Sequence, residues 1–288
     1  MKFPSCEKMM TTIDICGRNL YYFDSLYKNG RGNLTKAVEV KKKLEVLMPE
    51  PKMILEEKDI QKSRLLFRWL NAQKQGLESN FERALKANEI ALPTIGEYMS
   101  ARRAGCSDLL IVPKMDFEVL YSSIVAACKG ENMYRGIDPN SAMEFLFDFA
   151  EASLRRIQSS FYTILVRPGI PAEVSPEFTG KTPQEMRSQL EQISRDSQGT
   201  IFKGLSASEL ILYYAKLFLE KRLPNDQKMG LTFMTDDYMQ IGNEDIFLSM
   251  YFSLKDRKMF FSPMRQNEKG GSLRLGLVPK DAYRKAGK

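Results

Sequence analysis

The stretch that most constrains the fold is residues 138–167, because it carries the longest unbroken helical period in the sequence. Asp138 and Pro139 match the first positions of a helix, and Pro168 cannot continue one. The predicted element is therefore a buried core helix of about 28 residues, or about 42 Å. Its apolar side chains recur at steps of three and four, the spacing of one helix face: Met143, Leu146, Ala150, Leu154, Ile157, Phe161 and Leu165.

A proline-rich segment follows this helix and indicates a boundary. Residues 168–183 hold four prolines and two glycines with little periodicity, a composition typical of an extended connector. The sequence therefore predicts a mainly α fold, with two helical lobes joined by a Pro-rich connector and with extended N- and C-terminal arms. The expected parts are an N-terminal arm at 1–33, an N-terminal helical lobe at 34–167, the connector at 168–183, a C-terminal helical lobe at 184–261 and a basic C-terminal arm at 262–288.

Capping patterns predict where other helices begin. Thr94 with Glu97 and Ser206 with Glu209 have the spacing of a capping box, and Thr182-Pro183-Gln-Glu185 opens another helix. Apolar periodicity adds helices at 34–48, 55–75, 80–89 and 116–129. Residues 243–254 fit either helix or strand, and we favour helix because of the acidic residues at their start.

The last predicted element is extended. Residues 272–278 alternate between apolar and other side chains, which places Leu273, Leu275 and Leu277 on one side of a hairpin or an extended arm. Such an arm could dock on a neighbouring copy, so these leucines are the candidate oligomerisation residues.

The absence of histidine restricts the chemistry of any active site. The chain has no histidine, so it lacks the usual general base, the usual metal ligand and the partner of a Ser or Cys nucleophile. Its four cysteines form no CxxC pair and indicate neither a zinc site nor a disulfide framework. We therefore expect no enzyme, no metal and no cofactor. A magnesium-dependent enzyme using Asp236-Asp237 or Glu244-Asp245 stays as the third alternative.

Positive charge is concentrated near the C-terminus. From residue 255 onward, ten Lys or Arg stand against three Asp or Glu, so this segment accounts for the whole net charge of +7. A basic segment of this kind favours a polyanionic partner, most plausibly nucleic acid. No apolar run approaches the roughly 18 residues of a transmembrane helix, so no such segment is expected.

Basic side chains at helix edges are the candidate RNA-binding residues. Phosphate contacts need only donors and positive charge along a groove, so they leave no strict motif, whereas catalysis normally does. An aromatic side chain among them could stack on a base, although an ordinary amphipathic helix has the same composition. The candidates are Arg64, Arg68, Trp69, Lys74, Arg102, Arg103, Arg155, Arg156 and Arg167.

In general plan the chain resembles the nucleocapsid and coat proteins of RNA viruses. The features that carry this resemblance are the arm-like residues 1–33, the connector 168–183 and the basic, leucine-bearing residues 262–288. The resemblance implies a homo-oligomeric nucleoprotein that coats single-stranded RNA without sequence specificity, meets a viral polymerase, and resides in the virion and the host cytoplasm. The alternative is a matrix-like or scaffolding protein that binds an anionic membrane and partner proteins.

Overall fold

The computed structural model describes residues 50–70, 76–128, 157–169, 171–197, 200–222, 231–241, 243–253 and 258–282. Contacts between residues divide the chain into two compact units, 1–51 and 52–288, and the description below concerns the second. The predicted N-terminal arm at 1–33 and the predicted helix at 34–48 lie outside the described residues.

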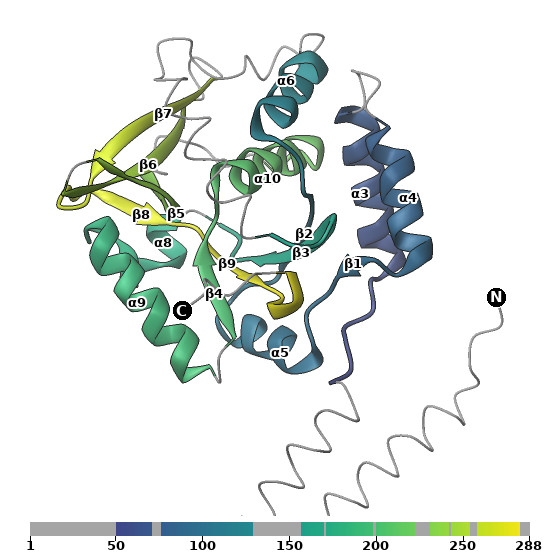
Figure 1. The fold of residues 1–288 in the computed structure, drawn as a ribbon, viewed down its shortest axis with the longest axis horizontal. Coiled ribbons are helices and arrows are strands. Elements are labelled where there is room, and N and C mark those ends of the chain that lie inside the picture. The colour runs from purple at the N-terminus through teal and green to yellow at the C-terminus, as the bar shows by residue number, and fades with distance from the viewer. Residues whose placement is uncertain are drawn as a thin grey trace, which may run out of the picture. The chain divides into compact units, whose positions relative to one another are not determined.

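A five-stranded sheet forms the centre of this unit, and β3 (Phe161–Val166) is its middle strand (Figure 1). The antiparallel strand β2 (Asp108–Pro113) pairs with β3 along one edge. Along the other edge, β1 (Ile90–Ala91) pairs in parallel with the start of β3, and β9 (Leu275–Val278) pairs antiparallel with its end. The outer strand β4 (Ile201–Gly204) pairs with β9.

Helices cover both faces of this sheet. Every residue of β3 is buried, and its side chains alternate between two apolar clusters, with Ile164 and Val166 in one and Leu165 in the other. The first cluster packs under α3 (Glu57–Leu70), α4 (Leu77–Ala87), α6 (Phe117–Cys128) and α10 (Ala207–Leu219). The second packs under α5 (Ile95–Arg103), the short helix η2 (Pro176–Phe178) and α9 (Pro183–Asp196).

A second sheet of four strands contributes to both clusters. The antiparallel strands β5 (Leu231–Ile241), β6 (Glu244–Ser253) and β7 (Lys258–Arg265) follow one another, and β8 (Gly271–Leu273) runs parallel to β5. Only Arg274 separates β8 in this sheet from β9 in the other, so one short segment links the two sheets. The short helices α8 (Pro171–Val174) and η4 (Lys280–Ala282) complete the described elements.

The predicted mainly α fold of two helical lobes is wrong, because the described residues form nine strands in two mixed sheets. The predicted core helix at 138–167 fails where it can be tested: 157–166 contains β3, and 138–156 lies outside the described residues. Residues 161–166 read FYTILV, an apolar run that suits a strand buried on both faces. Phe161 and Leu165, the last two residues of the predicted helical stripe, therefore belong to a strand whose residues are all buried.

Another predicted helix is wrong for the same reason. Residues 243–254, expected as a helix, contain β6, whose side chains at 247–250 are all buried. Residues 262–282, expected as an extended arm, contain the end of β7 together with β8 and β9. Because β9 pairs with β3, the predicted N-terminal lobe and C-terminal arm share one sheet.

The capping predictions are confirmed. Thr94 begins α5 and Ser206 begins α10, each in a capping box with the glutamate three residues later. Thr182 begins α9 in the same way with Glu185. In the described parts of the chain, no helix has both the length and the apolar character to cross a membrane.

Candidate nucleic-acid interface

Two of the predicted phosphate-binding arginines are held by carboxylates of α4. Arg64 donates from Nε and Nη2 to the two carboxylate oxygens of Glu82, at 2.5 and 3.1 Å. Arg68 donates from the same two nitrogens to Oε1 of Glu78, at 3.1 and 2.7 Å. The bidentate Arg64–Glu82 pair and the Arg68–Glu78 pair join α3 to α4. In the folded chain, Arg64 and Arg68 therefore balance negative charge.

These pairs change the electrostatics of α4. Hydrogen bonding to Arg64 lowers the pKa of Glu82 below its ordinary value, so the carboxylate stays ionised and paired. Hydrogen bonding to Glu82 and Glu78 raises the pKa values of Arg64 and Arg68. The two acidic residues on this side of α4 are thus offset by α3.

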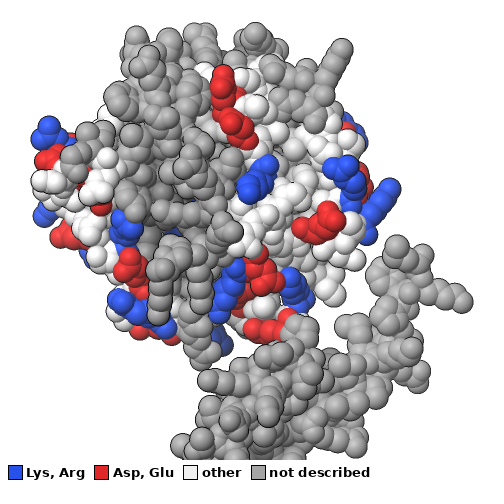
Figure 2. Space-filling model, in the orientation of Figure 1, with Lys and Arg blue, Asp and Glu red and all other residues white. Residues whose placement is uncertain are grey.

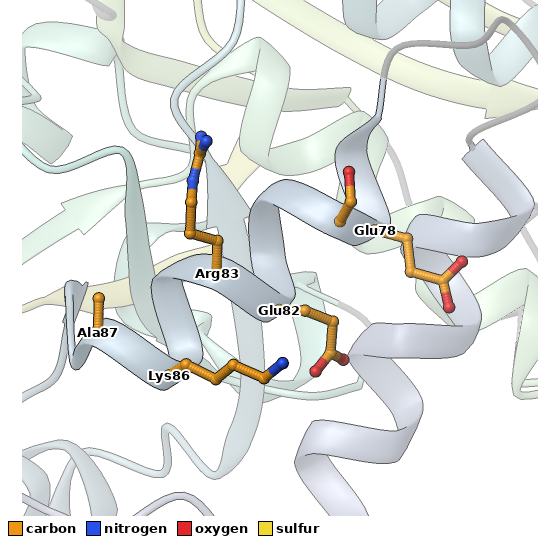
Figure 3. Close-up of a pocket in the computed structure, with 6 residues that line it drawn as sticks. Glu78, Glu82, Arg83, Lys86 and Ala87 are labelled. Carbon is orange, nitrogen blue, oxygen red and sulfur yellow. The ribbon is translucent and has the colours of Figure 1, made fainter.

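An open hollow lies along the same part of α4 (Figure 3). Glu78, Glu82, Arg83 and Lys86 line it, and Figure 3 shows Arg83 pointing away from the two carboxylates. Arg83 and Lys86 are exposed, and neither makes an ion pair with another described residue. Arg83 donates to the side-chain oxygen of Asn80 at 3.1 Å, and Lys86 points toward Glu82, whose pKa its charge helps to lower (Figure 3). With Glu78 and Glu82 paired to α3, Arg83 and Lys86 are the two cations that line the hollow.

A second hollow of about 180 Å³ adjoins the first, and Arg83 lines both. Lys114, which follows β2 and is exposed, lines its rim, and buried Phe161 and partly buried Met115 also line it. Glu89 is the acidic residue among its lining side chains. We call the two hollows together the α4 groove. Cations beside apolar surface are what a phosphate and a base would require.

Arg102 and Arg103 lie at the C-terminal end of α5, and both are exposed. Among the described residues neither has an ion-pair partner. Ile95 and Met99 lie on the same face of the helix and are 49% and 47% exposed, which is unusual for large apolar side chains. This α5 face is basic at one end and apolar at the other.

The remaining predicted binding residues within the described part have internal partners. Trp69 is partly buried and packs against Phe218, with ring centroids 5.9 Å apart. Arg167 donates from Nη1 to the carboxylate of Glu177 at 2.6 Å, and from Nε to the backbone carbonyl of Ala104 at 2.7 Å. Arg167 thereby ties the end of β3 to the end of α5. Lys74, Arg155 and Arg156 lie outside the described residues.

Leu273, Leu275 and Leu277 share one side of their strand, as predicted, and each is 0% exposed. They belong to the apolar cluster under α5 and α9. Their side chains are therefore enclosed within this chain.

The net charge of the described residues is close to zero. They contain 23 Lys or Arg and 24 Asp or Glu, so the remaining segments carry 20 Lys or Arg and 12 Asp or Glu. Figure 2 shows both signs interspersed on the visible face, without a continuous basic band among the coloured residues. Any anion-binding region of the described surface is therefore local.

A network of charged and hydrogen-bonded side chains joins β2 to α10. The carboxylate of Asp108 accepts hydrogen bonds from the Tyr213 hydroxyl at 3.0 Å and from the Lys216 amino group, and it lies 3.2 Å from Arg222. Burial alone would raise the pKa of Asp108, but Lys216, Arg222 and Tyr213 together lower it below its ordinary value. Burial and the nearby Asp108 raise the pKa of Tyr213. Asp108 and Lys216 are largely buried and Arg222 is partly exposed, so the network suits a structural role.

The described residues contain no group of three or more Cys, Asp or Glu that could hold a metal ion. The acidic pairs considered for magnesium lie in β5 and β6, where Asp236 and Asp237 are seven to nine positions before Glu244 and Asp245. Burial raises the pKa of the Cys106 thiol to about 12, so this cysteine is protonated and a poor nucleophile.

No protein family, curated protein or solved structure matches the chain. Sequence reasoning missed Arg83, Lys86 and Lys114, because each stands singly beside acidic or neutral residues. Because α3 packs on α4, Arg64 and Arg68 hold Glu82 and Glu78, and neither Arg83 nor Lys86 forms an ion pair with a described residue.

Proposed function

We propose that the protein binds single-stranded RNA without sequence specificity, with the α4 groove as the contact surface of its folded part. The observation that carries this proposal is the arrangement on α4, where Arg64 and Arg68 offset the carboxylates and Arg83 and Lys86 remain available. Phosphates need such donors, and they impose no sequence preference. Lys114 and the apolar lining of the second hollow support contact with a base as well.

The excess of basic residues outside the described part also supports an RNA partner. These segments carry eight more Lys or Arg than Asp or Glu, and they would add to the attraction of phosphate for the groove. As a nucleoprotein, the chain would bind RNA through the α4 groove and through these basic segments.

Fluorescence anisotropy with a labelled, unstructured RNA tests the proposal. The variant Arg83→Gln/Lys86→Gln should bind about tenfold more weakly than the unchanged protein. Its plot of log affinity against log salt should be shallower by about 1.4, since each lost phosphate contact on a single strand is worth about 0.7. Arg265→Gln/Lys269→Gln removes the same charge from two exposed positions, the end of β7 and the turn after it, and is the control for net charge; Arg265 lies 3.9 Å from Glu244.

Two outcomes would count against the proposal. Equal weakening by the groove variant and the control would mean that only net charge matters. Binding to liposomes containing anionic lipid, with no binding to RNA, would favour the matrix-like alternative, for which the exposed Ile95 and Met99 beside Arg102 and Arg103 provide a surface.

A further inference from the structure

Arg274 is a buried cation that lacks the partner such a group normally requires. It lies between β8 and β9 and is 1% exposed. Two other cationic side chains are buried among the described residues, and each has a carboxylate: Lys203 lies 3.0 Å from Glu209, and Lys216 contacts Asp108. Arg274 makes no ion pair with a described residue. A buried charge without a counter-charge is strongly destabilising.

The unpartnered atoms of Arg274 lie on one edge of its guanidinium. Nη1 donates to the backbone carbonyl of Arg167 at 3.3 Å, whereas Nε and Nη2 are buried without a hydrogen-bond partner. Nε and Nη2 form the edge that receives two oxygens of a carboxylate or phosphate side-on. The face of the guanidinium is occupied by the ring of Tyr213, whose centroid is 5.2 Å from Cζ.

Ser272 adds a third unpartnered donor on the same side of the strand. Its Oγ is buried and has no partner. Side chains alternate along this segment, because Leu273 and Leu275 belong to the cluster under α5 and α9. Ser272 and Arg274 therefore leave the backbone on the side opposite these leucines, where Arg274 meets the ring of Tyr213.

We propose that Arg274 and Ser272 form a buried site for an oxyanion such as phosphate. Two of its oxygens would accept from Nε and Nη2 of Arg274, and a third would accept from Oγ of Ser272. A water molecule could satisfy these donors but would not offset the charge, which an anion does. Because the site is enclosed, the anion is taken up as the chain folds, and it stabilises the folded state.

Thermal unfolding of the full chain in sodium phosphate and in sodium chloride, at the same pH and ionic strength, tests this site. A tenfold rise in phosphate above its dissociation constant should raise Tm by about 3 °C or more, and chloride should not. Arg274→Met should abolish the response to phosphate. Arg83→Gln/Lys86→Gln should keep it, which separates this site from the α4 groove.

A second measurement covers the case in which the Arg274 variant does not fold. Unchanged protein refolded in phosphate, desalted and then unfolded in acid should release about one phosphate per chain, as measured by ion chromatography. Equal Tm in phosphate and chloride, with no phosphate released, would overturn the proposal. So would a Tm that depends on protein concentration and not on phosphate, because the counter-charge would then come from a second copy.

Discussion

Replacing Lys203 by methionine should lower the free energy of unfolding, because it removes the counter-charge of a buried carboxylate. Lys203 is 4% exposed and Glu209 is 0% exposed. The Lys203 amino group lies 3.0 and 3.2 Å from the two carboxylate oxygens of Glu209. In Lys203→Met, Glu209 would remain buried as an anion without its counter-charge.

The size of the effect follows from what still holds Glu209. Removing one partner of a buried ion pair costs about 3–5 kcal/mol. The Tyr162 hydroxyl and the Ser206 backbone N–H still donate to the carboxylate, at 2.9 and 2.8 Å. These two bonds stabilise the anion, so we expect a loss near the lower limit, about 3 kcal/mol.

Urea denaturation at pH 7, followed by circular dichroism, measures this loss directly. Lys86→Met removes an exposed lysine that forms no ion pair with a described residue and should change the free energy of unfolding by less than about 0.5 kcal/mol. The double variant Lys203→Met/Glu209→Gln removes both charges and should be more stable than Lys203→Met alone. A loss for Lys203→Met no larger than that of Lys86→Met would refute the reasoning.

Three further predictions concern other parts of the fold. Gly271→Ala should lower the free energy of unfolding by about 1–3 kcal/mol, since a Cβ there would lie 2.1 Å from the buried ring of Phe233; unchanged urea denaturation would contradict this close contact. Thr182→Ala should cost about 1 kcal/mol in the same assay, because it removes the N-cap of α9, whereas Thr182→Ser should restore most of the loss. Asp108 has a lowered pKa in the folded state, so its stabilising effect is present above its unfolded pKa of about 3.9 and is lost as pH falls below that value. The difference in stability between the unchanged protein and Asp108→Asn should therefore be largest near pH 7 and shrink below about pH 4, and a difference independent of pH would contradict this.

Local signals in the sequence were enough to place several helices. Thr94, Thr182 and Ser206 each satisfy backbone N–H groups of the next turn, and this chemistry requires no tertiary contact. The starts of α5, α9 and α10 could therefore be predicted from four adjacent residues each.

The strands were missed because burial on both faces removes the alternation that identifies a strand. In β3 all six residues are buried, and in β6 the side chains at 247–250 are buried. A short, continuously apolar run fits a buried strand or a buried helix equally well. For β3, pairing with β2 and β9 decides in favour of a strand. Both of these partner strands lie more than 45 residues away from β3 along the chain.

The candidate binding site was predicted only in kind. The prediction and the proposed α4 groove both use basic side chains at helix edges, but Arg64 pairs with Glu82, 18 residues later, once α3 packs on α4. That pairing leaves Arg83 available, although its neighbours in sequence include Glu82. Charge along the sequence does not reveal which cations are neutralised, because the contacts that decide it are tertiary.

The most direct test of the central proposal is crosslinking of the protein to RNA that contains 4-thiouridine, followed by mass spectrometry of the crosslinked peptides. The account predicts crosslinks in peptides of α4 and in the peptide that contains Lys114 and Met115. These should diminish in Arg83→Gln/Lys86→Gln and persist in Arg265→Gln/Lys269→Gln. Crosslinks confined to the α5 face around Arg102 and Arg103, with none on α4, would contradict the assignment of the α4 groove as the RNA contact.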